Sequence, residues 1–400
     1  MIDNKNILLG VSGGIACYKT LELCSRLVKK NVNIKVIMTE SAKEFVRPVT
    51  FETMAKGLVY SDMWEGHHEE VHHIELPKWA DLMLIAPASA STIGKMANGI
   101  ADNFLIASYL ACQKDVIIAP SMNTQMLLNP ATQRNLQTLR EYGVKVIAPE
   151  SGVLACNTVG DGRMEEPKNI VKYLEDYFTD KDLVGKKIIV SAGPTIEPID
   201  YVRYITNHSS GKMGYNIANE AKKRGADVIL VSGPVNPFEI NGINKIEVKT
   251  NEEMKNAIEE NFDDANALIM AAAPVDYRPS TVSDRKIKKS GESINFEFIE
   301  NLDILKYFGS KKKDQTIIGF AAETDDLIEN ANKKLNVKNA DYIVANDLKK
   351  EGAGFNTDTN VASFISKDGV KDLEIMSKKE LANEILNLIR WYYLRKSNNW

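Results

Sequence analysis

A chain of 400 residues is long enough for two to four domains, and two is the simplest division. Its 50 Lys and Arg nearly balance 54 Asp and Glu, which argues against a broad basic surface for nucleic acid or a membrane, and 44% hydrophobic residues indicate a buried core rather than disorder. The longest apolar run, residues 267–275, has half the length of a membrane span. The four cysteines include no CxxC pair, so we expect no disulfide framework. We also expect no signal peptide and a cytoplasmic protein.

In the first half, short apolar runs alternate with segments of helical periodicity. A run that starts at Asn6 ends in the glycine turn Gly10-Val-Ser-Gly-Gly-Ile, and a helix with one apolar face is predicted at residues 16–30. Continuous apolar strands between helices are typical of a parallel, doubly wound sheet, whose ligands bind at the carboxyl ends of the strands. The other strands predicted here lie at residues 34–38, 82–86, 116–119 and 144–148.

The same alternation starts again after a predicted helix at residues 170–178. The polar segment 179–185 is interpreted as a hinge, because a new apolar strand follows it and ends in the small-residue turn Ser191-Ala-Gly-Pro. The sequence therefore predicts an α/β protein of two doubly wound domains, at residues 1–180 and 185–400. The strands predicted in the second domain lie at residues 187–190, 227–231, 267–270, 315–319 and 342–344.

Three loops of small residues follow strands of the first half. They are the glycine turn, Ala86-Pro-Ala-Ser-Ala-Ser-Thr and Ala119-Pro-Ser-Met-Asn-Thr-Gln-Met. Glycine lets a backbone approach an anion, and a helix N-terminus offers unpaired N–H groups with partial positive charge. One such loop could be an ordinary tight turn. Three along one sheet edge favour a nucleotide-like cofactor.

Two groups of side chains in this half suggest chemistry. The segment His67-His-Glu-Glu-Val-His-His could be a metal cluster, but a single histidine with an acid–base task is the preferred interpretation, because its pKa lies near neutrality. Cys156 lies in residues 150–167, a glycine-rich stretch predicted to contain no strand. A loop cysteine can be chemically inert, so spacing alone leaves its role open.

Polar loops in the second half are candidates for anion binding. Ser209-Ser-Gly-Lys precedes a helix predicted at residues 214–223, but it lacks the spacing of a Walker A motif. The run at residues 284–289 carries four positive side chains and follows a strand-end loop, so it favours phosphate contact over an ordinary solvated face. Lys334 and Lys338, four apart on a predicted helix, add two cations on one face.

These motifs together carry a resemblance that covers nearly the whole chain. The glycine turn, His73-Ile-Glu-Leu-Pro-Lys-Trp-Ala-Asp, Pro120-Ser-Met-Asn and Gly152-Val-Leu-Ala-Cys resemble the flavin-dependent cysteine decarboxylases. With the second half, the chain resembles the bifunctional phosphopantothenoylcysteine decarboxylase / phosphopantothenate–cysteine ligase family of coenzyme A synthesis. The resemblance implies a flavodoxin-like or Rossmann-like flavoprotein domain, a Rossmann-like ligase domain and a homo-oligomer.

For the first domain, the resemblance implies FMN and a decarboxylation in which the substrate thiol is oxidised to a thioaldehyde, which acts as an electron sink so that the carboxylate can leave. His73 would assist this step, Asn123 would bind the carboxylate, and Cys156 would be the acid that completes the reduction. Ser91 stands where the family has asparagine. The residues implied in FMN binding are Gly13, Gly14, Ile15, Thr39, Ser41, Ser89, Ala90, Ser91 and Thr92.

For the second domain, the resemblance implies that CTP activates 4′-phosphopantothenate as an acyl-cytidylate, from which the amine of L-cysteine displaces CMP. Lys286 would neutralise charge on the triphosphate, Asn207 would steady the tetrahedral intermediate, and Mg²⁺ would accompany the nucleotide. Leu302 replaces a proline of the family loop. The residues implied in CTP binding are Ala271, Ala272, Ala273, Asp276, Lys286, Asn301, Asp303, Ile304, Phe320, Lys334 and Lys338.

Three other functions fit the sequence less well. A nicotinamide-dependent dehydrogenase requires a GxGxxG turn, which neither half contains intact. A flavin-binding regulator without catalysis has no need of His73, Asn123 and Cys156. A flavoprotein acting on another cysteine-terminated substrate, or in prenyl transfer, fits the first domain alone but not the ligase-like second half.

Overall fold

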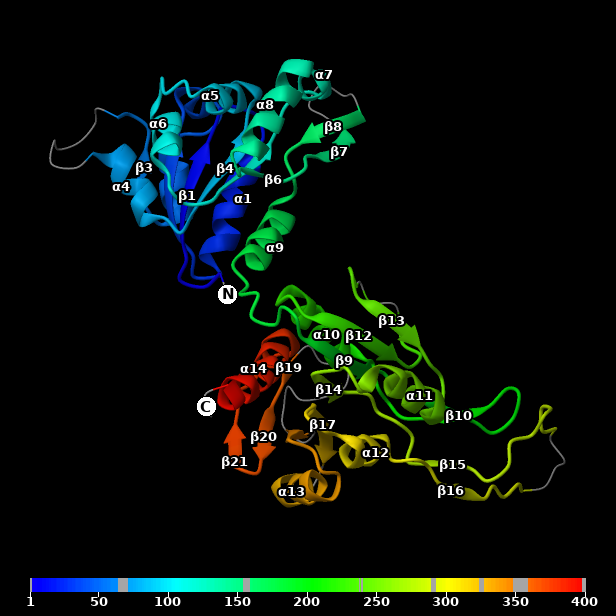
Figure 1. Cartoon of the computed structure of the whole chain (residues 1–400). Helices are drawn as coiled ribbons and strands as arrows, with labels where there is room; N and C mark the ends of the chain where they lie inside the picture. The colour runs from blue at the N-terminus through cyan, green and yellow to red at the C-terminus, as the bar shows by residue number, and fades with distance from the viewer. Residues whose placement is uncertain are drawn as a thin grey trace. The chain divides into compact units, whose positions relative to one another are not determined.

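The computed structural model of the chain (Figure 1) describes residues 2–63, 71–153, 159–236, 238, 240–288, 293–323, 327–347 and 359–397. The chain divides into two compact units, Met1–Thr179 and Asp180–Trp400. Among the described helices, none combines the length and the apolar character that crossing a bilayer requires.

The first unit is built on a parallel sheet of six strands in the order β3-β2-β1-β4-β5-β6. This is the order of a Rossmann-type sheet, in which the chain turns back between β1 and β4. The strands are β1 (Asn6–Val11), β2 (Asn33–Met38), β3 (Val59–Tyr60), β4 (Leu82–Ala88), β5 (Val116–Pro120) and β6 (Lys145–Val146). The helices are α1 (Cys17–Val28), α2 (Glu40–Lys43), α3 (Pro48–Ala55), α4 (His72–Trp79), α5 (Ala90–Asn98), α6 (Phe104–Ala111), α7 (Thr124–Leu128), α8 (Pro130–Glu141) and α9 (Pro167–Tyr177).

The sheet is buried on both faces because its strands are apolar at consecutive positions. In β1, Ile7 and Leu9 pack into one core with α1, α3 and α9, while Leu8 packs into a second core with α5, α6 and α8. Alternate side chains of a strand point to opposite faces, so one apolar run supplies both cores. The doubly wound fold predicted for this half is confirmed.

The second unit repeats this topology and extends it. In its eight-stranded sheet, β13-β12-β9-β14-β17-β18 are parallel and follow the Rossmann-type order, and β20 and β21 continue one edge as antiparallel strands. The strands are β9 (Lys187–Ala192), β12 (Asp227–Ser232), β13 (Asn244–Glu247), β14 (Ala267–Met270), β17 (Thr316–Glu323), β18 (Tyr342–Asp347), β20 (Ala362–Ser366) and β21 (Gly369–Asp372). The helices are α10 (Lys212–Lys223), α11 (Asn251–Phe262), α12 (Ile304–Lys311), α13 (Leu327–Val337) and α14 (Lys378–Ser397).

Helices cover both faces of this sheet as well. Along β9, Ile188 and Val190 pack against α10 and α14, and Ile189 packs against α11, α12 and α13. Three short antiparallel pairs lie outside the large sheet. They are β10 (Ile196–Pro198) with β11 (Tyr204–Thr206), β15 (Tyr277–Pro279) with β16 (Phe298–Glu300), and β19 (Thr359–Asn360) with β22 (Met376–Ser377).

Several expectations from the sequence were wrong in detail. The stretch 150–167, predicted to lack strands, contains the antiparallel pair β7 (Glu150–Val153) and β8 (Val159–Arg163). The strand predicted at 144–148 is confined to β6. The strand predicted to end at residue 319 continues to Glu323, so Phe320 lies within β17. Helix α13 ends at Val337, one residue before Lys338.

Candidate functional site

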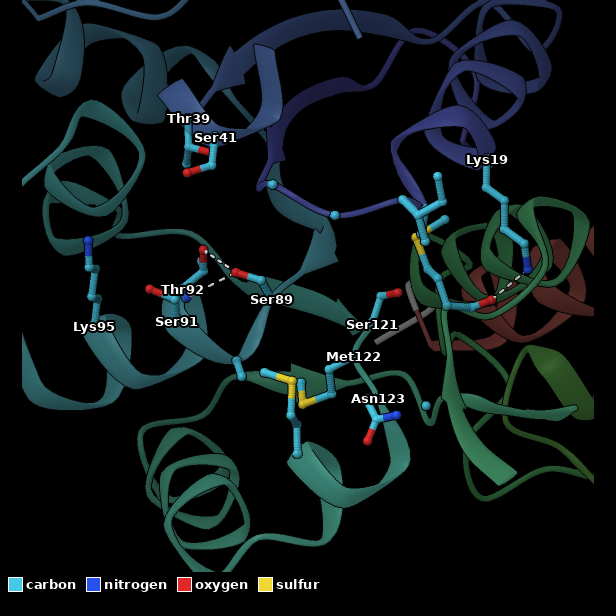
Figure 2. Close-up of a pocket in the computed structure, with 18 of the residues that line it drawn as sticks. Lys19, Thr39, Ser41, Ser89, Ser91, Thr92, Lys95, Ser121, Met122 and Asn123 are labelled. Carbon is cyan, nitrogen blue, oxygen red and sulfur yellow. Dashed lines mark hydrogen bonds between the residues drawn. The ribbon is translucent and has the colours of Figure 1, made fainter. Parts of the chain in front are cut away.

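In the first unit, loops from four neighbouring strands surround one cavity of about 890 Å³ at the carboxyl edge of the sheet (Figure 2). These loops follow β1, β2, β4 and β5, and β1 and β4 flank the point at which the strand order reverses. Open α/β sheets bind their ligands at such a point, and the volume is that of a site for a cofactor-sized molecule.

Every residue that the resemblance implied in FMN binding lines this cavity, and so does Asn123 at its other side. Of the remaining predicted residues of this domain, His73 stands at the start of α4 and is not among the lining residues. Cys156 lies outside the described residues. The lining residues implied by the resemblance are Gly13, Gly14, Ile15, Thr39, Ser41, Ser89, Ala90, Ser91 and Thr92.

The two glycines of the first turn do different things. A Cβ atom on Gly13 would lie 2.5 Å from Cβ of Ser41 and 2.9 Å from its carbonyl oxygen, so only glycine allows the β1 and β2 loops to lie in contact. A Cβ on Gly14 would meet nothing within 4 Å. Gly13 therefore allows the β1 and β2 loops to meet at one end of the cavity, here called its floor. The space next to Gly14 is part of the cavity.

Polar groups at this floor fit an anionic, hydrogen-bonding ligand. The hydroxyl Oγ1 of Thr39 is buried and has no hydrogen-bond partner among the residues that the structure describes. Burying a hydroxyl without a partner is costly, so a ligand that bonds to it restores the lost interaction. The start of α5 also lines the cavity, and there Oγ of Ser89 accepts a hydrogen bond from the Thr92 N–H at 3.3 Å (Figure 2). Helix α1 has no side-chain cap at its start, at Ala16. The cavity thus offers donors and a helix N-terminus to a phosphate and a hydroxyl-rich chain, as FMN would require.

The opposite wall of the cavity is formed by β8, which the sequence did not reveal. Gly162, at φ = 133°, lies so close to the loop after β5 that a Cβ would be 2.2 Å from the Met122 carbonyl oxygen. The Met122 N–H donates to the Gly162 carbonyl at 3.0 Å, and the Thr124 hydroxyl donates to the Asp161 carbonyl at 2.8 Å. These contacts hold the wall beside Asn123, whose side chain caps α7.

Lys19 is a lining residue that sequence reasoning missed. Its side chain is only 7% exposed, and its ammonium donates to the Met164 carbonyl at 2.9 Å and to the Glu166 carboxylate at 2.7 Å. The bond from Lys19 holds the pKa of Glu166 below its usual range. A signal existed, because Lys19 is spaced four residues from Leu23 and eight from Leu27 on the apolar face of the predicted helix.

In the second unit, the corresponding loops follow β9 and β14, and they are joined to each other. The Ala273 N–H donates to the Gly193 carbonyl at 2.9 Å, and the Asn207 amide donates to the Pro274 carbonyl at 2.8 Å. The predicted residues Ala271, Ala272, Ala273 and Asn207 are therefore brought to one edge of the sheet, again where the strand order reverses.

A buried polar cluster ties further loops to this point. Asn251, 1% exposed at the start of α11, donates from its amide to the Val275 carbonyl at 3.0 Å and the Leu302 carbonyl at 3.4 Å, and its Oδ1 accepts from the Thr195 hydroxyl. The Glu197 carboxylate accepts the Asn251 N–H at 3.0 Å and the amide of Asn301 at 2.9 Å. The loops that carry Asp276 and Asn301 thus share one set of hydrogen bonds.

Two of the predicted cations are already paired with protein oxygens. The Lys338 ammonium lies 2.6 Å from the Asp303 carboxylate, which also caps α12, and the Lys334 ammonium donates to the Phe320 carbonyl at 2.8 Å. Burial of Asp303 works against its ionisation, but the bonds from Lys338 and from the Lys306 N–H outweigh it and lower its pKa. Ile304 is buried at the start of α12.

Lys286 lies apart from these cations, on an exposed segment between β15 and β16. Asp276 is exposed at the end of the β14 loop, where its carbonyl accepts the Asn301 N–H at 2.8 Å. Among the residues that the structure describes, no three His, Cys, Asp or Glu side chains are grouped to hold a metal ion. His67 and His68, weighed above as metal ligands, fall outside those residues.

Comparison with known proteins agrees with the division into two units. Residues 1–179 match the family model described as "Flavoprotein", and residues 183–392 match "DNA/pantothenate metabolism flavoprotein C-terminal domain". The chain is 48% identical over 395 residues to the coenzyme A biosynthesis bifunctional protein CoaBC of Bacillus subtilis, covering 97% of each chain. It is 44% identical over 392 residues to CoaBC of Vibrio cholerae, covering 97% of this chain and 98% of that protein.

Among solved structures, the C-terminal domain of a CoaBC protein is 40% identical and covers 54% of this chain and 100% of its own, with a TM-score of 0.47. The identity to whole CoaBC proteins over nearly the full length is what decides the family. The chain therefore belongs to the family of bifunctional coenzyme A biosynthesis proteins, CoaBC, and is an enzyme that combines a phosphopantothenoylcysteine decarboxylase with a phosphopantothenate–cysteine ligase.

Proposed function

We propose that the second unit ligates 4′-phosphopantothenate to L-cysteine with CTP, and that the first unit decarboxylates the product with FMN to give 4′-phosphopantetheine. The observation that supports this proposal is that part of each predicted set gathers where the strand order reverses. In the first unit this is the FMN set around the cavity, and in the second it is Ala271, Ala272, Ala273 and Asn207 in the loops after β9 and β14. The two sites differ in character. One is an open cavity that fits a cofactor, and the other is a set of loops that carry cations and carboxylates.

In the proposed ligation, the substrate carboxylate attacks the α-phosphate of CTP, and pyrophosphate leaves. This activation is needed because a carboxylate has no leaving group that an amine can displace. Asp276, Asn301 and the backbone of residues 271–273 would bind the nucleotide, and Lys286 would neutralise the triphosphate. Mg²⁺ would enter with CTP, bound to its phosphates and to water, which suits a unit whose described residues form no cluster of metal ligands.

The amine of cysteine would then attack the acyl-cytidylate, and CMP would leave as the amide forms. Asn207 would donate from its amide to the oxyanion of this second step. At present that amide donates to the Pro274 carbonyl at 2.8 Å, which fixes the side chain at the β14 loop. The nucleotide site would be completed by Lys334, Lys338, Phe320, Asp303 and Ile304.

In the first unit, the glycine turn, Thr39, Ser41 and the start of α5 would hold FMN, and Asn123 would bind the carboxylate that is lost. FMN, when bound, supplies a two-electron acceptor for the substrate thiol and returns the electrons later. Cys156 would deliver the proton that completes the reduction, since the pKa of an ordinary thiol lies only about one to two units above neutrality. We propose His73 as the residue that assists decarboxylation.

The experiment that tests this function follows the two reactions separately in the purified chain. We expect flavin absorbance in the protein as isolated, and pyrophosphate release that requires CTP, phosphopantothenate and cysteine together. Asn207→Asp should accumulate the acyl-cytidylate and form CMP slowly. Cys156→Ser should stop decarboxylation after the oxidised stage while ligation continues. A colourless protein that binds no FMN, or pyrophosphate release without CTP, would contradict the proposal.

A further inference from the structure

Asp200 is a buried carboxylate in the turn between β10 and β11, and the proposed reactions give it no role. Its residue is 3% exposed, and its side chain is fully buried in its pair with Arg203. One carboxylate oxygen accepts the N–H groups of Val202 at 2.7 Å and Arg203 at 2.8 Å. These bonds close the turn, and they involve only one of the two carboxylate oxygens.

The other oxygen of Asp200 reaches a distant part of the chain. It accepts the Ile287 N–H at 3.1 Å and the Arg203 guanidinium at 2.7 Å. The same guanidinium donates to the Ile287 carbonyl at 3.3 and 3.4 Å. Asp200 and Arg203 therefore hold both polar groups of one residue, 87 positions away from Asp200.

The segment held in this way carries Lys286. Residues 283–288, here called the strap, are mostly exposed, with Ile287 less exposed than its neighbours Lys286 and Lys288. A second bond fastens the other end of the strap, where the Ser283 N–H donates to the Ile199 carbonyl at 3.1 Å. The backbone of the strap is thus fixed on the β10–β11 turn while the Lys286 side chain remains accessible.

We infer that Asp200 is a positioning residue for the ligase reaction, and that it acts by fixing the backbone next to Lys286 through Ile287 and Arg203. This inference rests on the proposed role of Lys286. A cation at the end of a flexible side chain stabilises growing charge only if its backbone is already in place, and small misplacements of a catalytic group cost large factors in rate.

Burial alone would make Asp200 hard to ionise, but the N–H bonds of Val202, Ile287 and Arg203 and the charge of Arg203 outweigh it and lower its pKa. The group is therefore ionised at neutral pH and accepts all four bonds at once. An asparagine in its place keeps the size but presents an NH₂ group to either the Ile287 N–H or the turn N–H groups. Asp200→Asn should release the strap or strain the turn.

The test measures ligation in the full chain for Asp200→Asn, Lys286→Gln and the double variant. We expect Asp200→Asn to lower kcat by about 10- to 100-fold with the KM for CTP changed less than about threefold. In the Lys286→Gln background, Asp200→Asn should have almost no further effect on kcat, because both changes remove the same contribution. Equal effects of Asp200→Asn in both backgrounds would overturn the inference, since they would indicate a role unrelated to Lys286.

A second measurement does not depend on the reaction. Trypsin cleaves after Arg285, Lys286 and Lys288, and we expect Asp200→Asn to speed cleavage within the strap at least fivefold. Unchanged cleavage would overturn the inference alone, whereas wild-type ligation by Lys286→Gln would refute the proposed role of Lys286 and the inference with it. Asp182→Asn is the matched control. Asp182 pairs with Arg224 at 2.7 Å, and it precedes β9 in the chain, so this pair lies at the amino edge of the sheet. It should leave kcat and strap cleavage unchanged.

Should Asp200→Asn fail to fold, as judged by lost decarboxylase activity and aggregation, Arg203→Lys carries the same test. Lysine keeps the charge beside Asp200, but it lacks the planar guanidinium whose several N–H groups bond to Asp200 and to the Ile287 carbonyl at once. We expect a smaller loss of kcat, the same lack of effect in the Lys286→Gln background, and faster cleavage of the strap. A loss that adds to that of Lys286→Gln would again overturn the inference.

Discussion

The two units use one strand order in two ways. In the first, the loops that follow four neighbouring strands enclose a cavity of about 890 Å³, and its floor contains the hydroxyl of Thr39, which has no partner among the described residues. In the second, the loops at the same point are joined by buried hydrogen bonds among Thr195, Glu197 and Asn251. A shared topology therefore fixes where a site lies, while the loop residues decide what kind of site it is.

This difference has a physical meaning. A site that holds a resident cofactor can leave polar groups unsatisfied, because the cofactor completes them. A site that binds and releases a nucleotide in each cycle must keep its loops in place while it is empty, so its buried polar groups bond to each other. Each change below tests whether one unit depends on its ligand and the other on its own hydrogen bonds.

The largest effect is expected for Asn251→Ala. The change leaves the Val275 and Leu302 carbonyls without the amide donor and the Thr195 hydroxyl without its acceptor. We expect the second unit to lose about 2–4 kcal/mol of unfolding free energy, and ligation to fall with it. Thermal unfolding and hydrogen exchange of residues 274–276 and 301–302 measure the loss. Asn98→Ala, which removes one exposed bond to the Gly94 carbonyl, is the control and should cost little. Equal losses from both variants would refute the special role of Asn251.

The second effect separates two neighbouring glycines. Gly13→Ala places a methyl group 2.5 Å from Cβ of Ser41, so the loops must move apart, and we expect the first unit to lose about 1–3 kcal/mol along with its flavin. Gly14→Ala meets no protein atom within 4 Å and should keep the thermal stability of the flavin-free protein. Its methyl group points into space assigned to the cofactor, so flavin affinity should fall. Titration with flavin measures the affinity, and thermal unfolding of the flavin-free protein measures the stability. Full flavin affinity in Gly14→Ala would show that the ligand does not lie against this turn.

The third effect concerns the unpartnered hydroxyl. Thr39→Val keeps the shape of the side chain and removes a hydroxyl that forms no hydrogen bond within the described part of the chain. The flavin-free protein should be as stable as before, while flavin affinity should fall about 3- to 20-fold, which corresponds to one lost hydrogen bond of about 0.6–1.8 kcal/mol. Thr316→Val is the matched control, because Oγ1 of Thr316 is also buried without a partner but lies in the second unit. It should not change flavin affinity.

The sequence predicted the apolar strands well, because a run that is buried on both faces has a clear pattern. It did not predict β20, whose residues mix buried and less buried positions between β18 and the edge strand β21, or the pair β7 and β8, whose glycine-rich residues carry no apolar pattern. The wall at Gly162 exists because a partner loop fits against it, and that partner is far away in the chain. The role of Asn251 has the same origin, since its partners come from three separate segments of the chain, at residues 195–197, 275 and 302.

The smallest expected effect tests the ion pair that joins α1 to the wall of the cavity. The Lys19 ammonium lowers the pKa of Glu166, so the stabilisation by this pair is complete above the pKa that Glu166 has in the unfolded chain, about 4.3, and is lost as pH falls through the lower pKa of the folded state. Glu166→Gln should therefore cost a constant amount from neutral pH down to about pH 5, and the difference from the wild type should shrink at lower pH. Because the Glu166 side chain is 32% exposed, solvent screening limits the cost to about 1 kcal/mol.

Unfolding of the first unit at equal flavin occupancy measures this cost. Glu22→Gln, which breaks an exposed pair with Arg26 in α1, is the control and should change stability less at every pH. A cost for Glu166→Gln that does not shrink below pH 4 would show that shape, rather than charge, holds Lys19 at the cavity wall.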